Sequence, residues 1–258
     1  MKIADVMSRD IITVDKDHDL KHILKLMKKH DITKIPVIDE KKLVGIVTDN
    51  LIAYKLGSRK KREIQAARLH ASSVMEKDMD IISPDDKVAS ILKKVGKPGP
   101  TMLPVIEGDD LIGVVTKADL LPLVKSSDTV SSVMKTSLFT VAPDDRVVHA
   151  RRVMIDNDIA RIPVVSEGHL VGMISDMEIA FAFAQLKQRF SLGRQKHQLD
   201  EFLVKDIMKT PAVWTTPSIT IKTAAQIMQK MNVGALPVLK DEDIIGIVSR
   251  TDILQTIA

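Results

Sequence analysis

The stretch LIGVVTKADL, residues 111–120, is an apolar run that ends in a threonine, and an aspartate follows three positions later. Near-copies stand at three other places: GIVTDNL from residue 45, GMISDME from residue 172 and GIVSRTD from residue 246. A hydroxyl residue followed by an acid at this spacing either caps a helix or holds a ligand. A repeated unit also decides the architecture of a chain, so the copies are the place to begin.

Further residues recur in step with these copies. A methionine that follows Val or Ile precedes each copy, and a Pro-Val pair begins 29 residues after it. A glycine stands nine residues beyond the proline, and a hydroxyl residue stands three beyond the glycine. The four sets are Met7, Pro36, Gly45 and Thr48; Met75, Pro104, Gly113 and Thr116; Met134, Pro163, Gly172 and Ser175; and Met208, Pro237, Gly246 and Ser249. This fixed register establishes four copies of one unit, which we place at residues 1–68, 69–127, 128–200 and 201–258.

The pattern of apolar residues predicts the elements of each unit. The period changes from 2 to 3.6 and back, which indicates a short strand, a helix, two strands and a second helix. The two strands, such as IPVI and LVGIV, are joined by a short polar turn and form a β-hairpin. The fold class is therefore α/β, with four repeated β-α-β-β-α units. Short polar side chains before the first helix predict its N-caps. These residues are Asp17, Asp85, Asp144 and Ser218.

The spacing between units predicts how they pair. From glycine to next methionine the chain runs 30, then 21, then 36 residues, so two pairs are expected, at residues 1–127 and 128–258. A unit of this size buries little apolar surface by itself, and we expect pairing of the sheets to complete the core. The two long connectors carry basic segments, residues 58–70 and 187–197.

The motif of VM, Pro-Val and Gly-x-Val-Ser/Thr-x-x-Asp resembles the cystathionine β-synthase (CBS) domain, and the resemblance covers nearly the whole chain. It implies two pseudo-symmetric pairs, called Bateman modules, whose clefts bind adenosine nucleotides or related adenosyl compounds. The expected function is that of a non-catalytic, energy-sensing regulator that binds AMP, ADP or ATP and signals to an unidentified partner protein. S-adenosylmethionine is an alternative ligand. The modules are expected to pack as a disc, within one chain or in a homodimer.

The intact motif selects two of the four units as ligand sites. Units 2 and 4 keep both the hydroxyl residue and the aspartate, whereas unit 1 has Leu51 and unit 3 has Glu178, which we interpret as a capping residue. In the family, residues just before the Pro-Val pair reach across to the partner unit, where basic ones meet phosphate. Only units 1 and 3 have a base there, Lys34 and Arg161. Apolar residues of the same two clefts are expected to line the pocket for the adenine.

These considerations give two predicted clefts. The first comprises Ile12, Ile32, Thr33, Lys34, Val114, Thr116 and Asp119. The second comprises Phe139, Ile159, Arg161, Ile247, Ser249, Thr251 and Asp252. The alternative for Thr116–Asp119 and Ser249–Asp252 is capping without a ligand, and the alternative for the two bases is a solvated surface position.

Composition adds few constraints. A net charge of +4 and a pI near 9.1 leave open a nucleic-acid-binding adaptor that uses the basic connectors, but the chain has only one Trp, one Tyr and five Phe for stacking on bases. We expect a cytoplasmic protein with no membrane insertion, because no secretory signal and no long apolar segment are visible. With no cysteine, and with only His18 and His22 at helical spacing, no metal site or catalytic residue is predicted.

Overall fold

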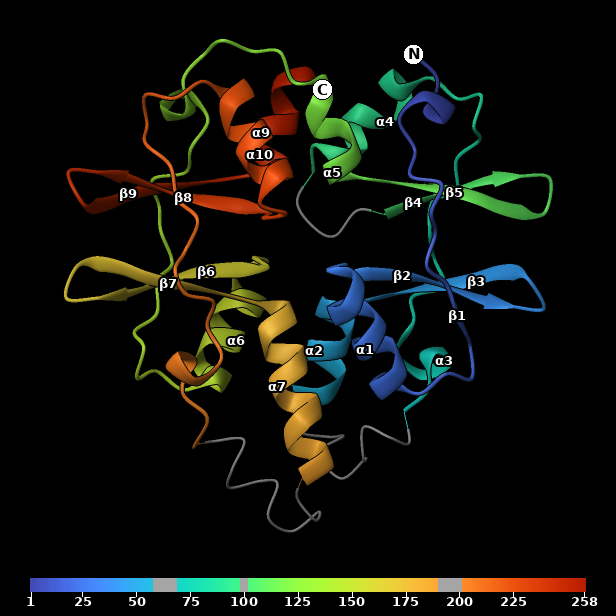
Figure 1. Cartoon of the computed structure of the whole chain (residues 1–258), viewed down its shortest axis with the longest axis horizontal. Coiled ribbons are helices and arrows are strands. Elements are labelled where there is room, and N and C mark those ends of the chain that lie inside the picture. The colour runs from blue at the N-terminus through green and yellow to red at the C-terminus, as the bar shows by residue number, and fades with distance from the viewer. Residues whose placement is uncertain (58–68, 98–101, 190–200) are drawn as a thin grey trace.

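The computed structural model describes residues 1–57, 69–97, 102–189 and 201–258, and it contains the four predicted units (Figure 1). The predicted segments 58–70 and 187–197 lie mostly outside the described residues. Units 1 and 2 form one module and units 3 and 4 form the other. Within the modules, β3 contacts β5 and β7 contacts β9. The α/β class and the two pseudo-symmetric pairs are confirmed.

The elements of the first module follow the predicted order. Unit 1 contains η1 (Ile3–Asp5), β1 (Val14–Asp15), α1 (Leu20–His30), β2 (Lys34–Asp39), β3 (Lys42–Thr48) and α2 (Asp49–Gly57). Unit 2 contains α3 (Ala71–Val74), α4 (Val88–Val95), β4 (Met102–Glu107), β5 (Asp110–Thr116), α5 (Lys117–Leu120) and η4 (Leu121–Leu123).

The second module repeats this order. Unit 3 contains η5 (Val130–Ser132), α6 (Val147–Asp156), β6 (Arg161–Ser166), β7 (His169–Ser175) and α7 (Asp176–Arg189). Unit 4 contains η6 (Val204–Asp206), α9 (Ile221–Lys230), β8 (Ala235–Lys240), β9 (Asp243–Ser249), α10 (Arg250–Leu254) and η7 (Gln255–Ile257).

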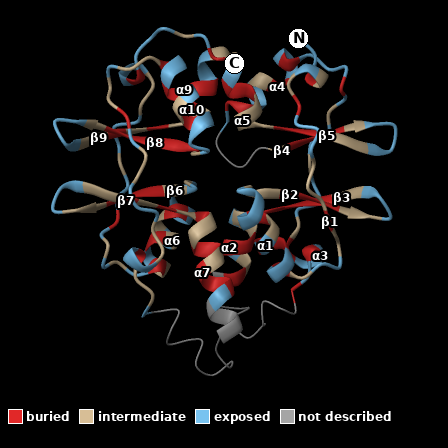
Figure 2. Ribbon diagram, in the orientation of Figure 1, coloured by how far each residue is buried: buried red, intermediate tan, exposed pale blue. Residues whose placement is uncertain are grey.

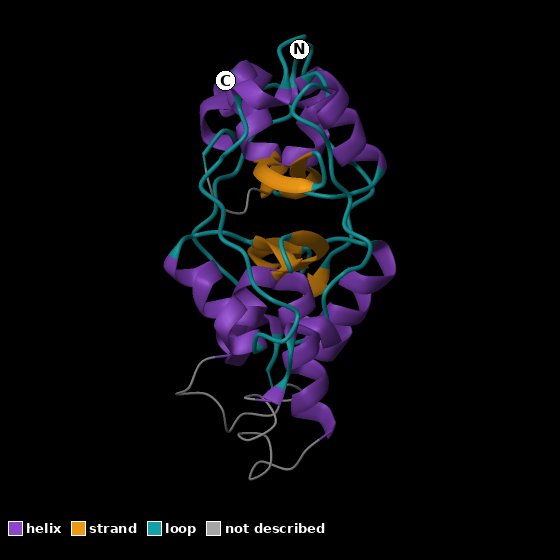
Figure 3. Cartoon of the chain, turned by 90° about the vertical axis from the view of Figure 1, so that its left-hand side faces the viewer, coloured by secondary structure: helices purple, strands orange, loops and turns teal. Residues whose placement is uncertain are grey.

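The hairpins form with the predicted turns. In three of them both central residues have a left-handed φ, as at Glu40 (48°) and Lys41 (69°), which matches the twist of the flanking strands. The predicted short strand is β1 in unit 1, where it pairs in parallel with β2. In the other units it is a single parallel bridge, made by Ile82, Val141 and Thr215. Figure 3 shows the strands in the middle of the molecule with helices above and below.

The start of each unit packs on the other unit of its module. Ser8 pairs with Val114, Glu76 with Ile46, Lys135 with Ile247 and Lys209 with Met173. This exchange explains why the methionine and glycine recur together. A Cβ on Gly113 would lie 2.6 Å from the sulfur of Met7, so only glycine leaves room for that side chain. The other three glycines face the methionine of the partner unit in the same way.

The predicted N-caps are wrong by two residues. The caps of α1 and α9 are Asp19 and Thr220, which accept from the backbone N–H of the residues three positions later. Asp85 and Asp144 instead form ion pairs, at 2.7 and 2.5 Å, with lysines in the exchanged starts, Lys2 and Lys205. Asp17 and Ser218 occupy the same turn before the helix. At Asp85 and Asp144 this side chain therefore binds the exchanged start of the other unit and does not cap the helix.

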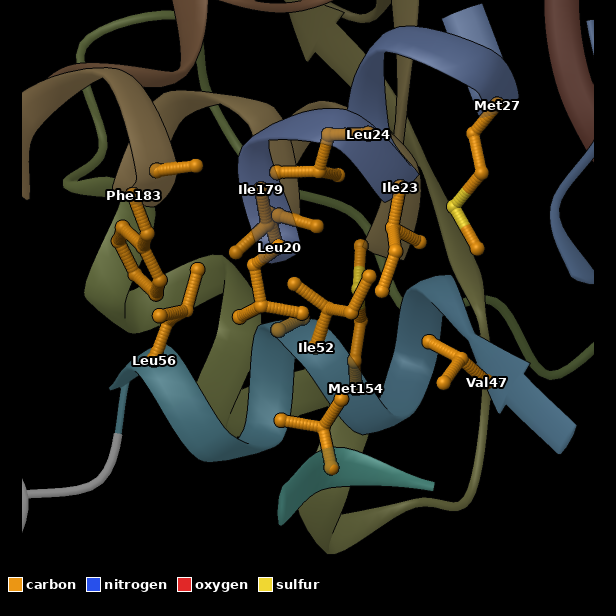
Figure 4. Packing of buried hydrophobic residues seen from close by; sticks show 14 of the residues in the cluster. Leu20, Ile23, Leu24, Met27, Val47, Ile52, Leu56, Met154, Ile179 and Phe183 are labelled. Atoms are coloured by element: carbon orange, nitrogen blue, oxygen red, sulfur yellow. The ribbon is translucent and has the colours of Figure 1, made fainter. Parts of the chain in front are cut away.

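Pairing within a module contributes to the hydrophobic cores, through residues of the exchanged starts such as Ile3 and Val74, but the cores also cross the boundary between modules. One core joins units 1 and 3 through α2 and α7, and the other joins units 2 and 4 through α5, α9, α10 and η4. Figure 4 shows Leu56, Ile179 and Phe183 close together in the first core. Figure 2 shows buried residues on the strands and helices of both halves. The two modules therefore pack side by side within this one chain, as a disc (Figures 1 and 3).

Arg151 occupies a position that is apolar in the corresponding helices of the other units. Its guanidinium donates to the carbonyl oxygens of Ala53 (3.2 Å) and Tyr54 (3.1 Å) in α2, and it lies 5.9 Å from the centre of the Tyr54 ring. This arginine therefore links the two modules at the edge of the first core.

The helices of the described part of the chain were also compared with the length and hydropathy of a membrane span. None of them is long and apolar enough to form one.

Candidate functional site

A cavity of about 1250 Å³ lies where the four units meet. Its lining includes every residue predicted for the two clefts: Ile12, Ile32, Thr33, Lys34, Val114, Thr116, Asp119, Phe139, Ile159, Arg161, Ile247, Ser249, Thr251 and Asp252. The clefts were predicted as separate sites, one in each module. In the structure they are two parts of one continuous space, so groups from one module can act on a ligand held in the other.

In the first module the motif of unit 2 is held from both sides. One oxygen of Asp119 accepts from the backbone N–H and the hydroxyl of Thr116, at 2.6 and 2.7 Å. The other oxygen accepts from the hydroxyl of Ser8, at 2.7 Å, which belongs to the exchanged start of unit 1. A carboxylate has room for about four hydrogen bonds, so Asp119 caps α5 and keeps capacity for a ligand.

The second module repeats this arrangement with a charged partner. One oxygen of Asp252 accepts from the backbone N–H and the hydroxyl of Ser249, at 2.8 and 2.5 Å. The other oxygen lies 3.5 Å from the ammonium of Lys135, the residue that corresponds to Ser8. Asp252 is only 5% exposed, yet it lines the cavity. Its side chain is therefore fixed in place before any ligand arrives.

The motifs of units 3 and 1 differ from each other. Glu178 accepts from the N–H of Ser175 at 2.9 Å and from its hydroxyl, and it pairs with Lys209 at 3.5 Å. The predicted capping by Glu178 is confirmed, but Asp119 and Asp252 cap in the same way, so capping does not separate the three units. In unit 1, Leu51 has no carboxylate, and its backbone N–H donates to the hydroxyl of Thr48 at 3.1 Å.

The two predicted bases lie inside the cavity and are not fully solvated surface residues. Lys34 and Arg161 are each half-buried. The guanidinium of Arg161 packs on Gly234 of unit 4, where a Cβ would lie 2.3 Å from Nη1. Burial lowers the pKa of Lys34, and the positive charges of Arg161 and Arg250 lower it further, although Asp49 opposes this. The positive charges of Lys34, Arg161 and Arg250 therefore lie near one another in the cavity.

Four further residues of the cavity were missed in the sequence. They directly follow the hydroxyl residue of each motif and are Asp49, Lys117, Asp176 and Arg250. Burial and the charge of Lys34 lower the pKa of Lys117 to about 8. Burial and the charge of Arg161 lower the pKa of Arg250 to about 10. Acids therefore begin the helices of units 1 and 3, whereas bases begin those of units 2 and 4.

Asp176 is the most buried of the four, at 4% exposure. Its carboxylate accepts from the side-chain amide of Asn50 in unit 1, at 2.9 Å. Burial nevertheless raises its pKa from 3.8 to about 6, and the nearby charge of Asp49 adds to the rise. Burial also raises the pKa of Asp49, against the opposing charge of Lys34. Asp176 consequently loses part of its charge in mildly acidic solution.

The raised pKa of Asp176 predicts a pH-dependent effect of Asp176→Asn. A change of one pKa unit is worth about 1.4 kcal/mol, so the ionised carboxylate costs the folded state roughly 1 to 3 kcal/mol above pH 6. That cost disappears as the pH falls from 6 toward 4, because the folded protein then takes up the proton. We expect Asp176→Asn to stabilise the protein by this amount at pH 8 and by much less at pH 4.

Urea unfolding at the two pH values measures the effect. Asp78→Asn, at an exposed position, is the control and is expected to change stability by less than about 0.5 kcal/mol at either pH. Equal stabilisation by Asp176→Asn at both pH values would show that the carboxylate charge is not the cause.

No group of three or more His, Asp or Glu side chains that could hold a metal ion occurs in the described part of the chain. His18 and His22 stack on each other, with ring centroids 4.5 Å apart. The polar groups of the cavity are instead bases, hydroxyls and carboxylates, which suit an organic ligand that carries hydroxyl and anionic groups.

Comparison with known proteins identifies the repeat. The CBS domain model matches residues 3–57, 71–126, 130–185 and 204–258. The uncharacterised protein MJ1404 of Methanocaldococcus jannaschii is 26% identical over 99% of this chain, which spans 62% of the length of MJ1404. The uncharacterised protein MJ1225 of the same organism is 26% identical and is matched over 98% of its length and all of this chain. The crystal structure of MJ1225 aligns over the whole of both chains at 22% identity with a TM-score of 0.85. The chain therefore belongs to the CBS domain family.

Proposed function

We propose that this protein is a non-catalytic regulator that binds adenosine nucleotides in two clefts, one in each module. The observation that carries the proposal is the meeting of two kinds of group in one cavity. The hydroxyl–aspartate motifs of units 2 and 4 face the same space as the bases Lys34 and Arg161 of units 1 and 3. Such a combination suits a ligand with a diol at one point and a phosphate at another.

The position of each group supports this assignment. Asp119 and Asp252 are held by their capping bonds and have acceptor capacity left for the two hydroxyls of a ribose. Apolar residues near them, such as Ile12 and Phe139, offer surface for the base. Phe139 is 44% exposed and lines the cavity, so its ring is accessible to a ligand.

Four bases of the cavity favour a phosphate over a sulfonium group at the places where they lie, although acids such as Asp49 and Asp176 line the same cavity. Lys34, Arg161, Lys117 and Arg250 all line the space. A ligand with a positive tail, such as S-adenosylmethionine, would be repelled there, whereas AMP, ADP or ATP would be attracted. We therefore place S-adenosylmethionine second as a ligand of this chain.

Signalling follows from the contacts that cross the units. A nucleotide in either cleft would touch two units of a module and would favour one relative orientation of them. Because the cores join the two modules, a change in one module is transmitted to the other. A regulated partner protein, or a second copy of this chain, would respond to that orientation.

Thermal melting against a panel of ligands tests the proposal. We expect AMP, ADP or ATP to raise the melting temperature more than GTP, NAD or S-adenosylmethionine. A ligand at about 100 times its dissociation constant adds roughly 2.7 kcal/mol to the stability of the folded state. A shift with GTP equal to that with the adenosine nucleotides, or no shift with any compound, would show that the ligand class is wrong.

A further inference from the structure

Asp49 and Asp176 hold corresponding places beside the two predicted bases of the clefts. The backbone N–H of Asp49 donates, at 2.9 Å, to the carbonyl oxygen of the residue that precedes Lys34. The backbone N–H of Asp176 donates, at 3.1 Å, to the carbonyl oxygen of the residue that precedes Arg161. Each of these bases therefore has an acid of its own unit fixed next to it.

Asn50 joins the two acids across the boundary between modules. Its backbone N–H donates to the carboxylate of Asp49, and its side-chain amide donates to the carboxylate of Asp176, each at 2.9 Å. The acids begin α2 and α7, the two helices that pack together in the core of units 1 and 3. The charge of Asp49 accordingly acts on Lys34 of its own module and on Arg161 of the other.

The acids occur in the two units that present a base before the Pro-Val pair. In units 2 and 4 that position holds Met102 and Ala235, and the following helices begin with Lys117 and Arg250. Both acids and all four bases line the same cavity. When the acids are ionised, they offset two of these four positive charges. The positive charge that a ligand meets is therefore smaller than the number of bases suggests.

Asp176 lies where its own charge is unfavourable to the folded state. The side chain is 4% exposed, and burial raises its pKa to about 6. A buried ionisable group with a shifted pKa that lines a ligand cavity is a candidate functional group. A carboxylate repels phosphate, so its use in a nucleotide site is to discriminate among ligands by their charge.

We propose that Asp49 and Asp176 determine specificity by charge, so that the clefts take an adenosine monophosphate in preference to a di- or triphosphate. The inference rests on the proposed function and deepens it, because it names the adenosine nucleotide that is favoured. Repulsion between a carboxylate and a ligand grows in proportion to the negative charge of the ligand, and each further phosphate adds to that charge. The acids therefore oppose ATP more strongly than AMP.

Replacing each acid with asparagine removes the charge and keeps the shape of the side chain. We expect Asp176→Asn and Asp49→Asn each to lower the ratio of the dissociation constant for ATP to that for AMP by about tenfold, mainly through tighter binding of ATP. Binding of adenosine, which has no phosphate, is expected to change much less. Calorimetric titration of the full chain at pH 8, in the presence of EDTA, measures the constants. Asp78→Asn, at an exposed position outside the cavity lining, is the matched control.

The pH dependence of the wild-type chain gives a second readout. Asp176 takes up a proton as the pH falls from 8 to 6, so its repulsion of ATP is present at pH 8 and weaker at pH 6. The wild-type ratio is therefore expected to fall toward that of Asp176→Asn. The variant retains the other titrating groups and is measured with the same nucleotides, so it corrects for their protonation. Charged groups of neighbouring elements that act on the two acids are Lys34, Arg151, Arg161 and Glu178.

The possible results separate the two proposals. If the wild-type chain binds none of AMP, ATP and adenosine, the proposed function is wrong. If it binds them, and both asparagine variants change the ratio no more than Asp78→Asn does, the function stands and the discrimination by charge is wrong. A wild-type preference for ATP over AMP at pH 8 would also overturn it. A fall in the ratio with either variant, in proteins that still melt cooperatively, supports it.

Discussion

Replacing both Asp119 and Asp252 with alanine is expected to abolish tight nucleotide binding, and each single replacement is expected to lower the stoichiometry from two ligands per chain to one. Each aspartate would accept hydrogen bonds from a ribose, and losing a charged partner of this kind costs about 1.5 to 3 kcal/mol. This corresponds to a loss of roughly ten- to a hundredfold in affinity at each cleft. Calorimetry on proteins that melt cooperatively measures the stoichiometry and the constants.

Glu178→Ala is the matched control because Glu178 makes the same capping bonds as the two aspartates. All three replacements are expected to destabilise the fold by about 1 kcal/mol through the lost cap. Only the two aspartate replacements are expected to remove a binding site. Equal loss of binding with Glu178→Ala, or a wild-type stoichiometry of four, would show that an intact motif does not identify the sites.

Replacing Phe183 with alanine is expected to cause a large loss of stability, about 3 to 5 kcal/mol. The ring is 1% exposed and lies in the core where α7 of one module meets α2 of the other. Because the cores join the modules, we expect the whole chain to lose stability together. In urea unfolding, the midpoint from circular dichroism and the midpoint from fluorescence of Trp214 should fall by the same amount.

Trp214 makes this test informative because it lies in unit 4, whereas Phe183 belongs to the core of units 1 and 3. Ile81→Ala, at a side chain that is 56% exposed, is the control and should change stability by less than about 0.5 kcal/mol. A fluorescence midpoint that stays constant in Phe183→Ala would mean that the two halves unfold independently.

The repeat made the fold of the single unit predictable from the sequence. Gly113 illustrates why: the glycine is required by the sulfur of Met7, so both residues recur in every unit and mark the register. The cleft residues could be placed for the same reason, since they occupy fixed positions relative to these marks. The N-caps were misplaced because the turn before the helix uses the same short polar side chains as a cap does.

The contacts between modules could not be predicted from the register. The apolar faces of α2 and α7 are compatible with burial against the sheet of their own module or against each other, and no spacing separates the two. Lys117 and Arg250 were missed for a related reason. Lys117 donates to Thr251 of the opposite module, a contact that no spacing reveals. The aligned residues Asp49, Lys117, Asp176 and Arg250 nevertheless carry a visible signal, because their charges alternate from unit to unit.

The core shared by units 1 and 3 has a consequence for synthesis of the chain. Ile52 of α2 and Ile179 of α7 belong to this core and are separated by the whole of unit 2, more than a hundred residues. At 5 to 20 residues per second, α2 waits roughly 6 to 25 s for α7 to leave the ribosome. During that time α4 and α5 of unit 2 are already made, although their apolar residues belong to the other core. We therefore expect premature pairing of the helices of units 1 and 2 to compete with correct folding of this chain.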